Sequence, residues 1–173
     1  SCGHGHDGAL GHGDQESSSV PRLVDWFGVQ TPPVLLRQVA CGADLAGAHS
    51  VAVSDAGRVY SWGLGSALGT SSPVSQPLPQ LVAGALKRKR VESVACGGCL
   101  TVAVTGSGRV FSWGRWANGR LGVGPQPRPS AAQSRRSMFR RQVQRFQLHP
   151  AEVRLRRPKG ETSGLEGGGK DEE

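Results

Sequence analysis

Two stretches of this sequence decide the fold: HSVAVSDAGRVYSWG at residues 49–63 and LTVAVTGSGRVFSWG at residues 100–114. They start 51 positions apart, and nine of their fifteen positions are identical. Two of the differing pairs, Ser54 with Thr105 and Tyr60 with Phe111, are conservative. Chance does not explain such a match, so the chain contains an internal repeat, and internal repeats say most about architecture.

The pattern inside one copy predicts a small antiparallel sheet. Residues 49–54 are short and β-branched, which favours a strand. Residues 55–57 form a tight turn, in which glycine supplies positive φ. Residues 58–62 then alternate with period two, so Val59 faces one side of the sheet and Trp62 faces the other. One such sheet cannot bury both faces alone and needs neighbours stacked beside it.

The match extends outward from both copies. Residues 39–42 (VACG) parallel residues 94–97 (VACG) at an offset of 55, so the first copy carries four additional residues within 43–48. A glycine-rich loop follows each copy, at residues 63–69 and 114–124, and residues 3–13 resemble these two loops. The loops at residues 3–13 and 63–69 lead to a proline-centred connection and an apolar pair, and a third extended piece is expected near Leu81 and Val82.

The order of these elements resembles the repeat of the regulator of chromosome condensation. The best copy is CGGCLTVAVTGSGRVFSWGRWANGRLGVG at residues 96–124, and the likeness covers residues 1–124. The resemblance implies a β-propeller of about seven four-stranded blades. We therefore expect an all-β chain: an incomplete β-propeller followed by a basic, largely disordered tail. Because the chain starts inside a repeat, we expect a fragment of a longer protein.

Four segments are expected. They are the end of a broken first repeat (1–33), a full repeat or blade (34–90), a partial repeat (91–124) and a basic linker or tail (125–173). The sequence departs from the family pattern in places. Cys2 stands where tryptophan is expected, and Leu100 stands where His49 fits the pattern in the other copy.

The resemblance also implies that the Cys-Gly and Trp-Gly pairs and the turn glycines are structural. These residues are Cys41, Gly42, Gly57, Trp62, Gly63, Cys96, Gly97, Gly108, Trp113 and Gly114.

Positive charge is concentrated in the second half. The net charge of +8 divides into −3 for residues 1–86 and +11 for residues 87–173. Such asymmetry suggests an acidic partner or a solvated basic tail. The candidate contacts are Lys87, Arg88, Lys89, Arg90, Arg135, Arg136, Arg140, Arg141 and Arg145. The first four are compatible with a nuclear import signal, a phosphate-contacting patch or a solvated loop.

The segment that carries the other five arginines has two interpretations. Phe139, Val143 and Phe146 have helical spacing, which allows a short basic amphipathic helix before Pro150. Such a helix could bind nucleic acid, an acidic membrane surface or an acidic protein. The alternative is a disordered tail or sequence from a faulty gene model.

Neither catalytic nor metal-binding motifs stand out. No G-x-S-x-G or H-E-x-x-H motif is present. Cys96-x-x-Cys99 lacks a second ligand pair for zinc. His4, His6 and His12, with Asp7 and Asp14 nearby, lie in a loop that the repeat already explains. We expect no catalytic residue, no metal and no cofactor.

The expected function is that of a protein-interaction scaffold module. The alternatives are guanine-nucleotide exchange on a small GTPase, as in the founding member of the family, and chromatin or nucleic-acid binding through the basic half. The partner is expected to be a protein, such as a small GTPase or histones, with nucleic acid possible through the tail. The four tryptophans do not form a recognisable cluster in the sequence, which disfavours the light sensing of plant ultraviolet receptors in the family.

The cysteines and the hydropathy bear on location. Four irregularly spaced cysteines do not make a disulfide framework. No run of 18 apolar residues is present. We expect an intracellular protein of the cytoplasm or nucleus.

Overall fold

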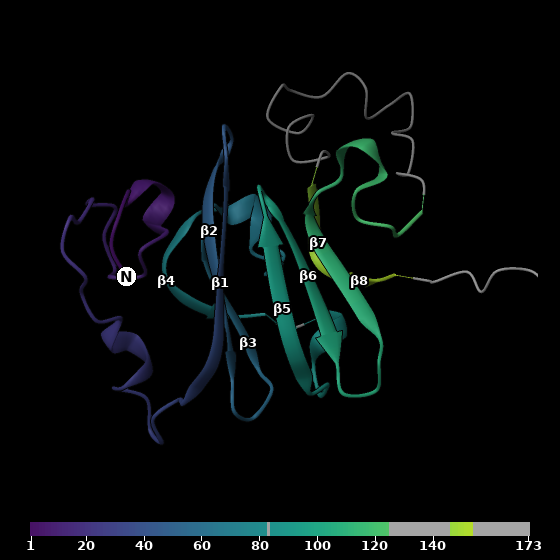
Figure 1. Ribbon diagram of the computed structural model, residues 1–173, viewed down its shortest axis with the longest axis horizontal. Coiled ribbons are helices and arrows are strands. Elements are labelled where there is room, and N and C mark those ends of the chain that lie inside the picture. The colour runs from purple at the N-terminus through teal and green to yellow at the C-terminus, as the bar shows by residue number, and fades with distance from the viewer. Residues whose placement is uncertain (83, 125–145, 154–173) are drawn as a thin grey trace, which may run out of the picture.

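The computed structural model describes residues 1–82, 84–124 and 146–153, and these form two four-stranded antiparallel sheets (Figure 1). The first sheet contains β1 (Leu36–Asp44), β2 (Gly47–Ser54), β3 (Val59–Gly63) and β4 (Gln76–Leu81) in that order. The second contains β5 (Val91–Gly97), β6 (Leu100–Thr105), β7 (Val110–Arg115) and β8 (Phe146–Glu152). The expectation of an all-β chain is confirmed for the described residues.

Short 3-10 turns connect the strands. They are η1 (His6–Gly8), η2 (Asp25–Phe27), η3 (Gly65–Ala67), η4 (Gly84–Leu86) and η5 (Ala117–Gly119). No helix in the described part of the chain is long and apolar enough to cross a membrane.

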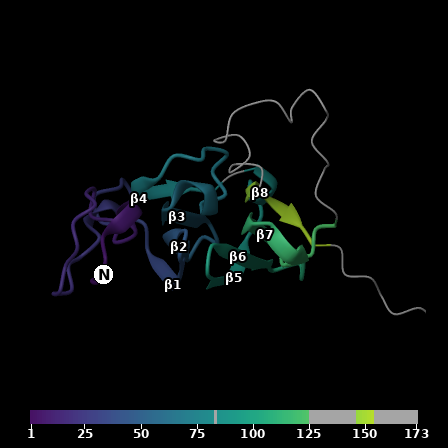
Figure 2. The ribbon, with the colours of Figure 1, turned by 90° about the horizontal axis from the view of Figure 1, so that it is seen from above.

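The two copies of the repeat fold alike. In the first sheet β2 and β3 pair from His49 with Gly63 to Val53 with Val59. In the second sheet β6 and β7 pair from Leu100 with Gly114 in the same register. The sheets stand side by side as two consecutive blades, with β1 and β5 adjacent and β4 and β8 at the other edge (Figure 2).

The residues before each Cys-Gly pair form the first strand of each blade. The period-two pattern is strongest in the following hairpin, so local pattern alone did not predict these two first strands. The additional residues within 43–48 lengthen the β1–β2 hairpin, which closes at Asp44 with Gly47, whereas the β5–β6 hairpin closes at Gly97 with Leu100. The longer β1–β2 hairpin therefore projects beyond its neighbour (Figure 1). Leu45, between the two strands of this hairpin, is fully exposed.

A hydrophobic layer joins the two blades. Val51 and Val53 of β2, with Val59 of β3, lie in one buried cluster with Phe111 and Trp113 of β7. Burial of one such valine or phenylalanine side chain contributes about 1.5–3 kcal/mol. The alternation predicted from the sequence is confirmed, because Val59 faces this layer while Tyr60 and Trp62 face the opposite side of the sheet.

Both outer flanks of the blade pair are incompletely covered by the described residues. On the second blade Val102, Val104 and Val110 are half-buried, although their repeat counterparts in the first blade are fully buried. On the first blade residues 1–34 cover Trp62 and Tyr60 but leave an apolar hollow of about 760 Å³ beside β1. Each flank therefore retains apolar surface of the kind that joins the two blades to each other.

Part of the expected tail belongs to the second blade. Residues 146–152 form β8, which pairs with β7 through Ser112 with Ala151 and Gly114 with Gln147. The helix considered for this segment is wrong at Phe146, since this residue begins a strand. Phe139 and Val143 lie outside the described residues. Pro150 lies in an outermost strand of the described sheet, which is where a sheet tolerates proline.

Candidate functional site

Polar contacts made by Gln38 and His49 connect the two blades and fix their register. The amide of Gln38 on β1 donates to the carbonyl of Val94 on β5 at 2.8 Å and accepts from the N–H of Val94 at 3.0 Å. The side-chain amide of Gln38 thus pairs with both backbone groups of Val94, as the backbone of a neighbouring strand would. The ring of His49 on β2 contacts the hydroxyl of Thr101 on β6 at 2.8 Å, and both residues are buried.

The tryptophan of each Trp-Gly pair rests on the glycine-rich loop of the preceding repeat. The indole N–H of Trp62 donates to the carbonyl of Ala9 at 2.9 Å. A Cβ at Gly11 would lie 2.7 Å from the Trp62 Nε1, and a Cβ at Gly69 would lie 2.8 Å from the Trp113 Nε1. Only glycine leaves room for the ring at these two loop positions. The packing of the ring on a loop glycine therefore recurs in both repeats, although among the described residues only Trp62 has a hydrogen-bond partner for its indole N–H.

The remaining repeat residues have different surroundings. Gly57, Gly63, Gly108 and Gly114 have positive φ values between 73° and 105°, which side chains rarely adopt. A Cβ at Gly42 would lie 2.5 Å from the Gly98 carbonyl, whereas a Cβ at Gly97 meets no described atom within 4 Å. Nothing in the structure explains a requirement for glycine at position 97.

The two cysteines of the Cys-Gly pairs differ because only one faces a neighbouring blade. Cys96 is packed against the layer between the blades. Cys41 is exposed and lines the apolar hollow on the open flank. Cys41 and Cys96 therefore differ in exposure because a second blade is stacked against only one of them, although their local sequences are the same.

Cys99 belongs to a small polar cluster at the end of the blade junction. Its thiol donates to the carboxylate of Asp44 at 3.0 Å, and Arg115 contacts the other oxygen of Asp44 at 3.2 Å. Burial, together with Asp44, raises the pKa of Cys99 to about 12, and burial raises the pKa of Cys96 to about 11. Burial alone would raise the pKa of Asp44, but hydrogen bonds from Cys99, the Ala46 N–H and Arg115 lower it overall.

The raised pKa values make these two thiols weak nucleophiles at neutral pH, because the thiolate is the reactive form. No group of three or more His, Cys, Asp or Glu side chains within residues 1–82, 84–124 and 146–153 is placed to hold a metal ion.

The basic cluster Lys87–Arg90 lies in the connection that leads from η4 into β5. Its backbone is engaged at several points. The N–H of Lys89 donates to the Leu86 carbonyl at 3.0 Å, and the Arg90 carbonyl accepts from the N–H of Gly106 at 3.0 Å. Arg88 itself adopts a positive φ of 64°. The connection is therefore a formed turn whose backbone places four cationic side chains close together.

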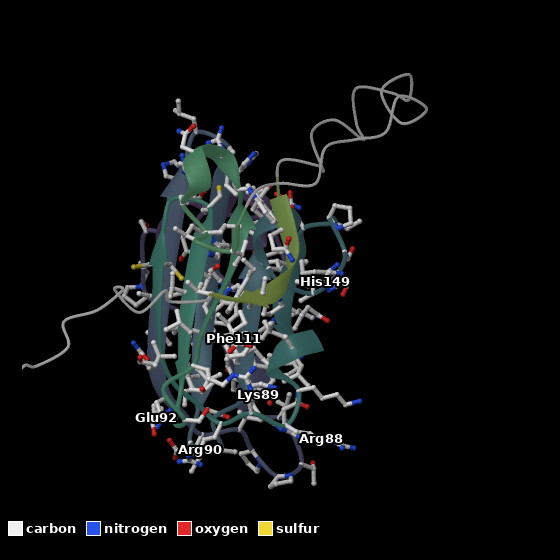
Figure 3. The ribbon with its side chains drawn as sticks, turned by 90° about the vertical axis from the view of Figure 1, so that its right-hand side faces the viewer. Arg88, Lys89, Arg90, Glu92, Phe111 and His149 are labelled. Carbon is white, nitrogen blue, oxygen red and sulfur yellow. The ribbon has the colours of Figure 1, made fainter. Side chains whose placement is uncertain are left out.

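These side chains surround a hollow of about 650 Å³, which we call the basic groove. Arg58, from the other side of the β2–β3 turn, completes its cationic lining. Val59, Val82 and Leu86 give it an apolar floor. The ammonium of Lys89 lies 5.7 Å from the centre of the Phe111 ring, whereas Arg88 and Arg90 extend at the end of the blade (Figure 3).

The charge of the basic groove is largely uncompensated. Among the described residues, none of its five cations lies within ion-pair distance of a carboxylate, although ion pairs form elsewhere, as between Arg109 and Glu152. A hollow lined by like charges and low-dielectric walls concentrates ions of the opposite sign. The other sequence candidates, Arg135, Arg136, Arg140, Arg141 and Arg145, lie outside the described residues.

An aromatic cluster beside the groove was not anticipated from the sequence. Trp26 and Phe27 of η2 contact Tyr60 edge to face with ring centres 5.5 Å apart, and Phe27 contacts Trp62 at 5.8 Å. Trp113 belongs instead to the layer between the blades. Residues 26–27 lie far from residues 60–62 in the chain, so only the fold brings these rings together.

Comparison with known proteins identifies the repeat. The model of the "Regulator of chromosome condensation (RCC1) repeat" matches residues 1–53 and 56–104. The ultraviolet-B receptor UVR8 of Arabidopsis thaliana is 44% identical over 130 residues, which cover 72% of this chain and 27% of the receptor. The human E3 ubiquitin-protein ligase HERC2 is 37% identical over 126 residues, which cover 72% of this chain and 2% of the ligase.

Solved structures share the fold. Human WBSCR16 superimposes with a TM-score of 0.55 and 25% identity, covering 82% of this chain and 30% of that one. Yeast RCC1 (Prp20), solved bound to Kap60, gives a TM-score of 0.51 at 22% identity, covering 70% of this chain and 25% of that one. The expected propeller blades are confirmed, and the chain spans less than a third of each of these four proteins.

Proposed function

Because the chain belongs to the regulator of chromosome condensation (RCC1) repeat family, we propose that it is part of a propeller-shaped scaffold that binds an acidic protein partner through the basic groove. The observation that carries this proposal is the gathering of Arg58 and Lys87–Arg90 around one hollow. A backbone turn that is already formed loses little freedom on binding, which favours affinity. Complementary charge also accelerates encounter with the partner.

The formed backbone of the basic cluster favours this function over a linear import signal. Hydrogen bonds at Lys89 and Arg90 hold the turn in place. An import signal that is bound in an extended conformation would require these hydrogen bonds to break. A folded acidic surface or an acidic segment of a partner can meet the side chains where they already stand.

The class of partner follows from charge. Yeast RCC1 (Prp20) was solved bound to Kap60, and a second Prp20p structure is described with its binding properties to Gsp1p and histones. For this chain we carry over only that the partner is a protein. A small GTPase or another protein with an acidic patch matches a cationic groove, whereas a basic histone tail does not. The proposed activity is binding, and no covalent chemistry is assigned.

The open flanks support a larger assembly of blades. Half-buried Val102, Val104 and Val110 on one side and the apolar hollow beside β1 on the other have the character of blade interfaces. We propose that further blades cover both flanks in the whole protein, because exposed flanks of this kind promote aggregation. An intracellular location, in the cytoplasm or nucleus, is proposed on the free state of all four cysteines.

The test compares two sets of charge reversals in the full chain. The variant K87E/R88E/R90E changes the basic groove, and the matched variant R135E/R136E/R140E changes the net charge equally elsewhere. Binding of a short fluorescent polyglutamate peptide is measured by anisotropy at several salt concentrations. Three lost contacts of about 0.2–1 kcal/mol each correspond to about a tenfold loss of affinity. We expect this loss in the groove variant and little change in the matched variant.

Two results would count against the proposal. Equal weakening by both variants would assign binding to overall charge and not to the groove. Tighter binding of duplex DNA than of the peptide, with a steep salt dependence that the matched variant abolishes, would favour nucleic-acid binding by the basic tail.

A further inference from the structure

A second hollow continues the basic groove at the same end of the first blade. Its volume is about 450 Å³, and Ala56 and Arg58 line both hollows. The β2–β3 turn therefore separates two adjoining depressions. Residues from η2 and the loop after it, including Trp26 and Pro33, form the far wall of the second one. We call this second depression the aromatic hollow.

The aromatic hollow has the features of a pocket for one apolar side chain. Trp26 is half-buried and held edge to face against Phe27 and Tyr60, with ring centres 5.2 and 5.5 Å away. The side-chain amide of Gln30 donates to the Trp26 carbonyl at 2.9 Å and so fixes the loop. Rigid aromatic walls provide contact area at low entropic cost, and buried anchors in such pockets dominate binding energy at interfaces.

The two hollows differ in the charge of their linings. The basic groove contains Lys87–Arg90, whereas the aromatic hollow contains Asp55 beside Arg58 and no other charged side chain. The Asp55 carboxylate disfavours an acidic group at the aromatic end, since like charges repel. An occupant that satisfies both hollows must therefore be acidic at one end and apolar at the other.

We propose that an extended segment of a partner protein lies across both hollows, with acidic residues in the basic groove and one aromatic or large aliphatic residue in the aromatic hollow. The inference rests on the proposed function, because the acidic end uses the same groove. Charge complementarity at one end and the shared residues Ala56 and Arg58 support a single occupant of both. An extended chain advances about 3.3 Å per residue, so a short segment is enough to cross the turn.

The experiment uses two fluorescein-labelled peptides that share an acidic run and differ at one position after a short spacer, where one has phenylalanine and the other alanine. In a second pair of peptides the phenylalanine or alanine precedes the acidic run, so that both directions of the bound segment are tested. Anisotropy is measured with the full chain and with W26L. An apolar anchor worth about 1.5 kcal/mol or more gives at least a tenfold preference for phenylalanine in one of the two pairs. W26L is expected to remove the preference and to leave the affinity for the alanine peptide unchanged.

A second variant keeps the inference testable if W26L fails to fold. Pro33 is exposed and lines the aromatic hollow, so P33E adds a carboxylate to this lining at a loop position outside the strands. P33E is expected to weaken only the phenylalanine peptide. Equal affinity of the phenylalanine and alanine peptides in both pairs would overturn the inference and leave the proposed function intact. Failure of all acidic peptides to bind would remove both. Peptide-independent dimerisation blocked by P33E would assign the aromatic hollow to a second copy of the chain and also overturn the inference.

Discussion

The ring nitrogen Nε2 of His49 lies 2.8 Å from the hydroxyl oxygen of Thr101, although the two residues are 52 positions apart and belong to neighbouring blades. Ser50, the repeat counterpart of Thr101, donates its hydroxyl to the carbonyl of Ala9 in the preceding loop at 2.8 Å. The same position thus connects each blade to the one before it. His49 provides the partner at one junction, and Leu100 occupies the place of His49 in the next repeat.

The burial of His49 predicts a pH-dependent stability. Burial lowers the pKa of this imidazole to about 4, below its ordinary value of 6.5. Between these values the unfolded chain binds the proton and the folded chain does not. The free energy of unfolding should therefore be constant with respect to this group above pH 6.5 and fall as the pH decreases toward 4, by up to about 1.4 kcal/mol per pH unit.

Urea denaturation at pH values from 7.5 to 4.5 measures this slope. The variant H49L should lose most of it, while H149L, at an exposed histidine, should retain it. An H49L slope equal to that of the unaltered chain would show that another group causes the pH dependence.

The contact between Gly69 and Trp113 predicts a large effect for one added methyl group. Gly69 and Gly108 share a φ of 73°, but a Cβ would strike the Trp113 ring at 2.8 Å only at Gly69. G108A should cost about 1 kcal/mol from backbone strain alone. G69A should cost 1–3 kcal/mol more, as is typical for overpacking of a core. Thermal unfolding followed by tryptophan fluorescence compares the two variants, and equal costs would contradict the packing of Trp113 on this loop.

The four cysteines should react with iodoacetamide in two groups. Cys2 and Cys41 are exposed, whereas Cys99 is buried and Cys96 is half-buried. Burial raises the pKa of Cys99 to about 12 and that of Cys96 to about 11, so almost no thiolate forms at neutral pH. Mass spectrometry of peptides after brief labelling should find modification at Cys2 and Cys41 well before the other two. Rapid modification of Cys99 in the folded chain would contradict its contact with Asp44.

The repeat, the family and the all-β class could be predicted from the sequence because they depend on local pattern. Alternation in β3 and β7, turn glycines and the Trp-Gly pairs are all visible within a few residues. β8 could not be predicted in the same way. Residues 116–145 separate it from β7, and its sequence, FQLHPAE, shares little with QPLPQL of β4 apart from one glutamine and one proline. Pairing with β7 assigns it to the sheet, and pairing is not a local property.

The candidate site was predicted only in part. The cluster Lys87–Arg90 was recognised from its charge, but Arg58 joins it from a turn some 30 positions earlier, and no sequence pattern links the two. The aromatic hollow was missed for the same reason, since Trp26 meets Tyr60 only when η2 packs on β3. The proline-rich stretch TPPV at residues 31–34 is typical of a turn, but only the fold shows that these residues line the hollow.

A double-mutant cycle at His49 and Thr101 tests most directly that the two repeats stack as consecutive blades in this register. H49L leaves the buried Thr101 hydroxyl with only its weak 3.7 Å contact to the Cys96 sulfur and should cost about 1–3 kcal/mol. H49L/T101V removes both polar groups, so its cost should be smaller than the sum of the single costs by 0.5–3 kcal/mol. Costs of H49L and T101V that simply add would mean that the two side chains do not meet, and the arrangement of the blades would be wrong.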